Sequence, residues 1–80
     1  IVLQRPGMLA VHGGKVYVTD RESNEVVVID SSSGKETLRF GKETLYHPDG
    51  VAVDSAGDIW VADTSNHRIA RFSSDGKLLK

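Results

Sequence analysis

The sequence lacks cysteine, long apolar runs and any excess of charge of one sign. Without cysteine it can form neither a disulfide nor a zinc site with cysteine ligands. No apolar run approaches the roughly 20 residues that a transmembrane helix needs, and no targeting or lipidation motif is recognisable, so we predict no membrane partner and assign no compartment. Ten basic and eleven acidic residues give a net charge of −1 without charged blocks, which is typical of a soluble surface and argues against a nucleic-acid partner.

Helical periodicity is missing as well. No stretch of ten residues carries apolar positions at helical spacing without a breaker inside it, so we predict essentially no helix. The chain instead has short runs rich in Val, Ile, Tyr, Trp and Phe, bounded by Gly, Asp, Ser or Asn, which is typical of strands and hairpin turns. The predicted strands are 8–12, 15–19, 25–30, 36–40, 50–54, 58–62, 68–72 and 77–80.

These strands fall into two copies of one pattern with a period of 42 residues. That period lies within the range of about 40–45 residues seen for four-stranded propeller blades, and the β-type residues exclude helical repeats of similar length. The matching segments are PGMLAV at 6–11 with PDGVAV at 48–53, GKVYVTD at 14–20 with GDIWVAD at 57–63, SNEVVVI at 23–29 with NHRIARF at 66–72, and GK at 34–35 with GK at 76–77.

The second copy resembles an NHL repeat in three segments, Pro48–Asp54, Gly57–Thr64 and Asn66–Ile69. The resemblance implies an all-β fold in which four-stranded antiparallel blades form a closed β-propeller, commonly with six blades. It places one blade at about 6–41 and a second at about 48–80, with residues 1–5 completing an outer strand of a neighbouring or last blade. The first copy departs from the motif, because Met8 replaces the glycine and Asn24-Glu25 replaces His67-Arg68.

Two blades alone leave an apolar face open at each end, and repeats of this kind usually need about three units for stability. We therefore expect self-association. A two-blade unit closes only into even blade numbers, so a six-bladed C3 homotrimer is our first choice and an eight-bladed tetramer our second. Reading on from Lys80 to Ile1 completes the last outer strand, as in one period of a designed, evolved or excised array. The residues expected to exchange strands between copies are Ile1, Val2, Leu3, Leu78 and Leu79.

Asp63 and Arg68 stand five residues apart across a predicted hairpin, close enough for an ion pair that locks the turn. Asp20 takes the place of Asp63 in the first copy but has lost this partner, so we expect it to use Arg21 or Arg68 instead. The residues expected to lock the blades are Asp20, Asp63, Asn66, His67 and Arg68, and those expected to pack between blades are Tyr17, Val18, Trp60 and Val61.

His12 and His47 are expected at opposite ends of inner strands, where symmetry-related copies could place a cation site. They lack local ligand spacing, and a turn or surface role explains them better, so we predict no metal or other cofactor. The turn at 54–58 faintly resembles a calcium loop but lacks its alternating ligands and distal glutamate. No phosphate-binding glycine loop, nucleophile elbow or other catalytic set is present.

The leading interpretation is a non-enzymatic, self-assembling structural module whose partners are other copies of this chain. One alternative is a protein- or RNA-binding module, since NHL-like propellers include such binders; its basic face would draw on Arg5, Arg21, Arg39, Lys42 and Arg71. The other alternative is a piece of a propeller enzyme such as an amidating lyase or a lactonase, for which only His12, His47 and Asp49 offer groups at a channel mouth.

Overall fold

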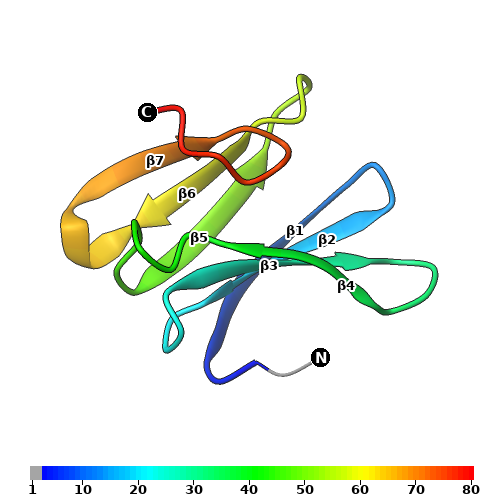
Figure 1. The fold of residues 1–80 in the computed structure, drawn as a ribbon, viewed down its shortest axis with the longest axis horizontal. Helices are drawn as coiled ribbons and strands as arrows, with labels where there is room; N and C mark the ends of the chain where they lie inside the picture. Colours follow the sequence, from blue (N-terminus) through cyan, green and yellow to red (C-terminus); the bar gives the residue numbers. More distant parts are fainter. Residues whose placement is uncertain (1–2) are drawn as a thin grey trace.

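The structure, a computed structural model, describes residues 3–80 and arranges them in two antiparallel sheets (Figure 1). The N-terminal sheet has the order β1-β2-β3-β4 and the C-terminal sheet the order β5-β6-β7, so each is a meander of neighbouring hairpins. The prediction of an all-β fold is confirmed, with one turn of 3₁₀-helix, η1 (Thr64–Asn66), in the described part of the chain. The strands are β1 (Pro6–His12), β2 (Lys15–Asp20), β3 (Glu25–Asp30), β4 (Glu36–Phe40), β5 (Pro48–Val53), β6 (Ile59–Asp63) and β7 (Arg68–Phe72).

The prediction of a fourth strand in the second sheet, at 77–80, was wrong. The segment still runs back along β7, with backbone N–H groups of Ser73 and Arg71 donating to the carbonyls of Lys77 and Lys80. Between these two bonds β7 advances two residues while the returning segment advances three, which interrupts the ladder as a bulge does. Only the isolated bridge between Phe72 and Leu78 remains.

The two sheets share their irregular features as well as their strands. Each opens with a bulge, between Pro6 and Leu9 in β1 and between Pro48 and Gly50 in β5. Asn24 and His67, which the sequence repeat aligns, have positive φ angles of 63° and 55°, a left-handed conformation that is uncommon for residues other than glycine. The repeat seen in the sequence is therefore also a repeat of backbone geometry.

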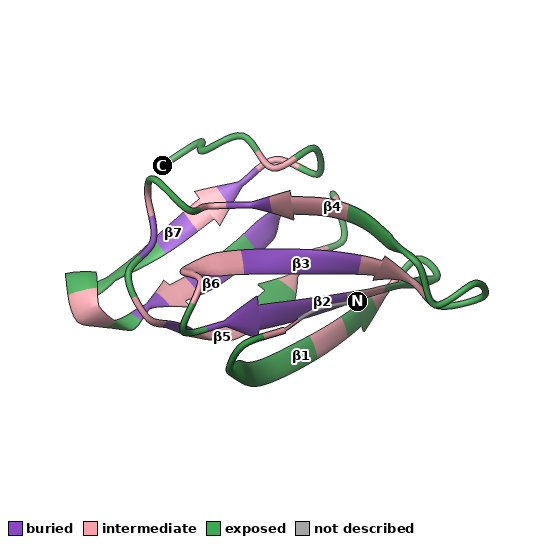
Figure 2. Ribbon diagram, turned by 60° about the horizontal axis from the view of Figure 1, so that its bottom comes forward, coloured by how far each residue is buried: buried purple, intermediate pink, exposed green. Residues whose placement is uncertain are grey.

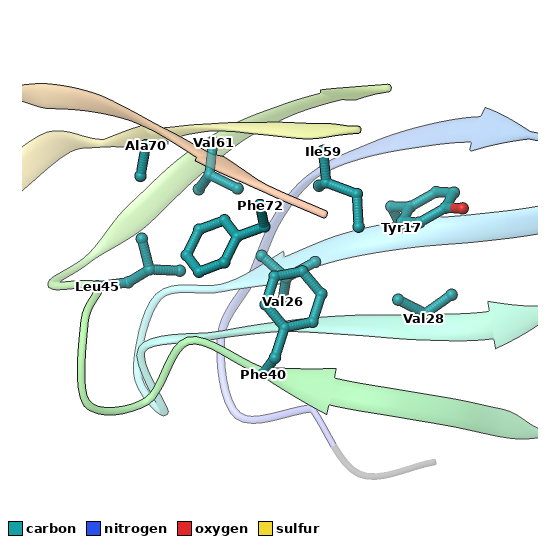
Figure 3. Close-up of a cluster of buried hydrophobic side chains, with 9 residues drawn as sticks. All are labelled: Tyr17, Val26, Val28, Phe40, Leu45, Ile59, Val61, Ala70 and Phe72. Carbon is teal, nitrogen blue, oxygen red and sulfur yellow. The ribbon is translucent and has the colours of Figure 1, made fainter. Parts of the chain in front are cut away.

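The hydrophobic core lies between the two sheets, where side chains from each point toward the other (Figure 3). Phe40 and Phe72 meet at its centre with ring centroids 4.9 Å apart, and Leu45 reaches in from the segment that joins the sheets. The N-terminal sheet contributes Tyr17, Val26, Val28 and Phe40, and the C-terminal sheet contributes Ile59, Val61, Ala70 and Phe72.

Each sheet also has a face that points away from this core. Each of these faces carries exposed apolar side chains, although Val18 and Val27 of the N-terminal sheet are buried. Figure 2 shows β1 largely exposed and the middle of β3 buried. The alternation of side chains along paired strands defines the two faces. We call them the N-terminal open face, which consists of Leu9, Val11, Val16, Val18, Val27 and Ile29, and the C-terminal open face, which consists of Gly50, Ala52, Trp60, Ala62, Ile69 and Arg71.

Candidate functional site

Asp63 ends β6 with its carboxylate fully buried, and it binds three donors. The backbone N–H of Tyr46 donates to Oδ1 at 2.7 Å, while Nδ2 of Asn66 and Nε of Arg68 donate to Oδ2 at 2.9 and 2.7 Å. Arg68 also donates through Nη2 to the carbonyl of Thr44 at 2.9 Å. Asp63 and Arg68 thus tie the β6–β7 turn to the segment that enters β5.

These bonds keep the carboxylate of Asp63 charged. Burial by itself would raise the pKa of Asp63, but the hydrogen bonds from Tyr46, Asn66 and Arg68 outweigh it and hold the pKa below its usual range. A carboxylate in this state is an acceptor only, and both of its oxygens accept hydrogen bonds here.

Asp20 occupies the corresponding place in the N-terminal sheet and is also fully buried. The structure gives it neither Arg21 nor Arg68 as an ion-pair partner within residues 3–80, contrary to our expectation. Backbone N–H groups replace the guanidinium, because the sheet entry and the β2–β3 turn both point donors at it: Gln4 at 2.9 Å, Arg5 at 3.0 Å, Glu22 at 3.2 Å and Ser23 at 3.4 Å. Burial would raise the pKa of Asp20, and these bonds lower it on balance.

A hydrogen bond between the sheets joins the left-handed turn of the first sheet to the segment that enters the second sheet. The side-chain Oδ1 of Asn24 accepts the backbone N–H of His47 at 2.8 Å. His67, the counterpart of Asn24, contributes its backbone N–H to Thr64 at 3.0 Å and closes η1, so its described role in the turn is through the backbone.

Trp60 lies on the C-terminal open face, where its ring is held on two sides. Its Nε1 donates to Asp54 at 2.9 Å, and this bond holds the pKa of Asp54 below its usual range. The guanidinium of Arg71 lies 5.0 Å from the ring centroid and is itself bound to Asp58 at 2.6 Å. Both carboxylates of the loop that faintly resembles a calcium site therefore have side-chain partners.

The four residues expected to pack between blades divide between two environments. Tyr17 and Val61 lie in the core between the sheets. Val18 is buried on the N-terminal open face, and Trp60 is 39% exposed on the C-terminal open face. The sequence repeat aligns Trp60 with Tyr17 and Ile69 with Val26, so the open face of the second sheet corresponds to the core-facing side of the first.

The candidate metal and strand-exchange residues are dispersed. His12 ends β1, whereas His47 directly precedes β5, with Nδ1 2.9 Å from Oγ of Ser65. Within residues 3–80 no three His, Asp or Glu side chains are grouped as metal ligands. Leu3 is half-buried and Leu78 and Leu79 are about half exposed, at 47% and 52%. Ile1 and Val2 lie outside the described residues.

Sequence reasoning missed the Asn24–His47 bond and the attachment of Trp60 to Asp54. The first had a signal, because the repeat aligns Asn24 with His67 in a turn and asparagine is enriched in the left-handed conformation. The second had no comparable signal in the sequence.

Comparison with known proteins shows similarity to one repeat family. Residues 45–72 match the family model described as NHL repeat, so this part of the chain is an NHL repeat. The chain is 33% identical over 76 residues to Protein brain tumor of Drosophila melanogaster, and 33% identical over 67 residues to B-box type zinc finger protein ncl-1 of Caenorhabditis elegans. It is also 32% identical over 60 residues to Peptidyl-alpha-hydroxyglycine alpha-amidating lyase 1 of Drosophila melanogaster.

These matches cover most of this chain but little of each relative. They span 92%, 84% and 71% of the chain and 7%, 8% and 11% of the respective relatives. The similarity is thus limited to the repeat that the proteins share. It does not extend to the full length of the relatives, to which their activities belong. Among the helices of the described chain, none has the length and apolar character required to cross a membrane.

Proposed function

We propose that this chain is a two-blade NHL unit with a non-enzymatic structural role, whose open faces take blades of the same kind from further copies. The observation that carries the proposal is the difference in burial between equivalent residues. Tyr17 and Val26 are 5% and 0% exposed, whereas Trp60 and Ile69 are 39% and 62% exposed. Within the chain, the facing sides of the two blades form one complete junction. The two open faces are the two halves of a second junction, which a further copy of the chain can complete.

The two halves have complementary chemistry. The N-terminal open face presents the aliphatic residues Leu9 and Val11, 60% and 67% exposed, at positions equivalent to Val51 and Val53, which pack against the core. The C-terminal open face offers an apolar hollow of about 240 Å³ beside Trp60. A second copy can therefore place its first sheet on the second sheet of its neighbour in the manner of the internal junction.

The free energy of burying the open faces, compared with the cost of association, favours a closed ring over an open dimer. Burying the four most exposed of these side chains contributes roughly 1.5–3 kcal/mol each. That total is comparable with the cost of about 4–15 kcal/mol for losing rigid-body freedom on association. One junction between two chains is thus weak, whereas a closed ring has as many junctions as chains. The proposal keeps the C3 trimer of six blades first and the tetramer second.

Light scattering after gel filtration tests this assembly. Three copies of the 8.7 kDa chain give about 26 kDa, and the variants Ile69→Asp and Leu9→Asp should each reduce the species to a folded monomer. Ser32→Asp, in the exposed β3–β4 turn, is the charge-matched control and should leave the mass unchanged.

Mixing the two disrupted variants tests the head-to-tail arrangement. Each retains one intact face, and the intact faces are complementary, so the mixture should form 1:1 dimers and nothing larger. Because a single junction is weak, these dimers should need a higher protein concentration than the wild-type ring. A wild-type chain that stays monomeric at micromolar concentration refutes self-assembly. Variants that homodimerise through their remaining face refute the head-to-tail geometry.

An enzymatic role is the second candidate, favoured by the similarity to an amidating lyase. Of the three groups available to it, Asp49 accepts a hydrogen bond from the hydroxyl of Thr64 at 2.6 Å and His47 contacts Ser65. Incubating the chain with a peptidyl-α-hydroxyglycine substrate, with and without added divalent metal, decides the matter. Product formation that is lost in His47→Gln would replace the structural proposal.

A further inference from the structure

A small pocket of about 150 Å³ opens at the end of the molecule where β1 and β5 begin, and charged side chains surround it. Its four lining residues come from the entry of the first sheet, from the β2–β3 turn and from the entry of the second sheet. They are Arg5, Arg21, Glu22 and His47.

Hydrogen bonds that lead to a buried carboxylate fix the backbone of the two arginines, which are themselves exposed. The N–H of Arg5 donates to the buried carboxylate of Asp20 at 3.0 Å, and the N–H of Arg21 donates to the carbonyl of Arg5 at 2.9 Å. The side-chain stem of Arg21 lies across Gly7, with Cγ and Cδ each 3.6 Å from where a Cβ would stand. The position of both guanidinium-bearing segments thus depends on one fully buried carboxylate.

His47, which also lines the pocket, is fixed through its side chain as well as its backbone. Its N–H donates to Asn24 at 2.8 Å, its ring stacks on Tyr46 with centroids 4.2 Å apart, and its Nδ1 lies 2.9 Å from Oγ of Ser65. In the tautomer in which Nδ1 accepts the hydroxyl of Ser65, Nε2 carries a hydrogen that it can donate.

The arginines of the pocket differ in their pairing from the other arginines of the chain. Arg39, Arg68 and Arg71 each form an ion pair with a carboxylate. Within residues 3–80 neither Arg5 nor Arg21 does so, although Glu22 lines the same pocket. Among the side chains that line the pocket, two guanidinium groups stand against the one carboxylate of Glu22. The buried carboxylate of Asp20 lies nearby, but its oxygens accept backbone N–H groups and not the guanidinium groups of Arg5 and Arg21.

We propose that this pocket binds a small oxyanion, of the carboxylate or phosphate kind, through Arg5, Arg21 and His47. Guanidinium groups present pairs of N–H donors that match the oxygens of either anion, and charge-assisted bonds of this type are the strong ones. The volume is well below the roughly 300–1,000 Å³ of pockets that enclose whole small molecules. The pocket therefore takes an anionic group and leaves the rest of a larger ligand outside.

The repeat itself does not explain this cluster. The positions equivalent to Arg5, Arg21 and Glu22 in the second copy are His47, Thr64 and Ser65, which include no arginine. The charge is thus a property of this one junction and not of the blade pattern. All four lining residues belong to a single chain, so the site exists whether or not the chain self-assembles.

Two-dimensional ¹H–¹⁵N NMR of the full chain tests the proposal, with inorganic phosphate and acetate as separate probes and sodium chloride as the matched ionic-strength control. Saturable shifts are expected at the amides of residues 5, 21, 22 and 47. Arg5→Gln and Arg21→Gln should each weaken binding about tenfold or more, which corresponds to about 1.4 kcal/mol. Glu22→Gln should strengthen it, and Lys15→Gln, at the opposite end of β2, should not change it.

The two probes distinguish the source of the anionic group. Saturation by phosphate alone assigns a tetrahedral oxyanion, saturation by acetate alone assigns a carboxylate, and saturation by both supports recognition of the group they share. The proposal is overturned if chloride gives the same shifts, if no amide of the pocket responds, or if Arg5→Gln and Arg21→Gln bind like Lys15→Gln. Arg21→Lys, which keeps the charge but loses the paired donors, should fall between wild type and Arg21→Gln.

Discussion

Replacing the carboxylate of Asp63 by an amide tests the lock between the β6–β7 turn and the entry of β5. In Asp63→Asn the oxygen that accepts the N–H of Tyr46 can remain, but the new NH₂ group faces donors from Asn66 and Arg68. Two bonds to a charged acceptor are lost, and charge-assisted bonds contribute about 1.5–3 kcal/mol each. Because the side chain of Arg68 is 40% exposed and regains water, we expect a loss near the lower end of the sum for two such bonds, about 3 kcal/mol.

The sign of the pH dependence follows from the lowered pKa of Asp63. The folded-state pKa lies below the unfolded value of about 3.9, so the lock stabilises the folded chain above that pH and its contribution is lost as the pH falls through the folded pKa. The difference in unfolding free energy between wild type and Asp63→Asn should therefore be large at pH 7 and shrink steadily below pH about 4.

Urea unfolding followed by far-UV circular dichroism, at fixed protein concentration and at several pH values, measures both quantities. Arg68→Met should cost less than Asp63→Asn, because Asp63 keeps the donors Tyr46 and Asn66, and the double variant should show a coupling of about 0.5–3 kcal/mol. A difference that stays constant from pH 7 to pH 3, or additive effects of the two substitutions, would refute the account of Asp63 as a charged lock.

Three further predictions concern the core, a turn and the tryptophan. Phe72→Ala, at a side chain 1% exposed in the core, should lower the unfolding free energy by about 3–5 kcal/mol in urea titrations. Gly41→Ala should cost about 1–3 kcal/mol by the same measurement, because φ is +99° and the added Cβ would stand 2.5 Å from Cδ1 of Leu45. Titrating wild type to acid should shift the emission of Trp60 when Asp54 protonates, at a pH below the ordinary carboxyl value; Asp54→Asn should lack this transition.

The sequence predicted the sheets well because the information was local. Alternating apolar residues, glycine turns and the 42-residue repeat are all visible in a single chain, and seven of the eight predicted strands exist. The eighth failed for a reason that patterns do not carry, since an extra residue between Lys77 and Lys80 interrupts the pairing with β7. The residue types at 77–80 do not distinguish a regular strand ladder from a bulged one.

The candidate site was less predictable, because it depends on partners distant in sequence. The Asp63–Arg68 pair was found from a five-residue spacing, but the donors that replace Arg68 around Asp20 are backbone groups, and every residue other than proline carries one. The pocket of Arg5, Arg21 and His47 spans 43 residues and joins two blades, so no local motif marks it. Its members appeared in the sequence only as separate cations and a candidate metal ligand.

The two buried aspartates explain how one blade pattern can keep its shape while its motif changes. In each sheet the aspartate accepts the N–H of the residue two positions before the first proline, Gln4 for Asp20 and Tyr46 for Asp63. The next N–H differs: that of Arg5 returns to Asp20 of its own blade, whereas that of His47 is taken by Asn24 of the preceding blade. The aspartate therefore fixes the entry of its own strand, and the left-handed residue of the turn is free to link successive blades.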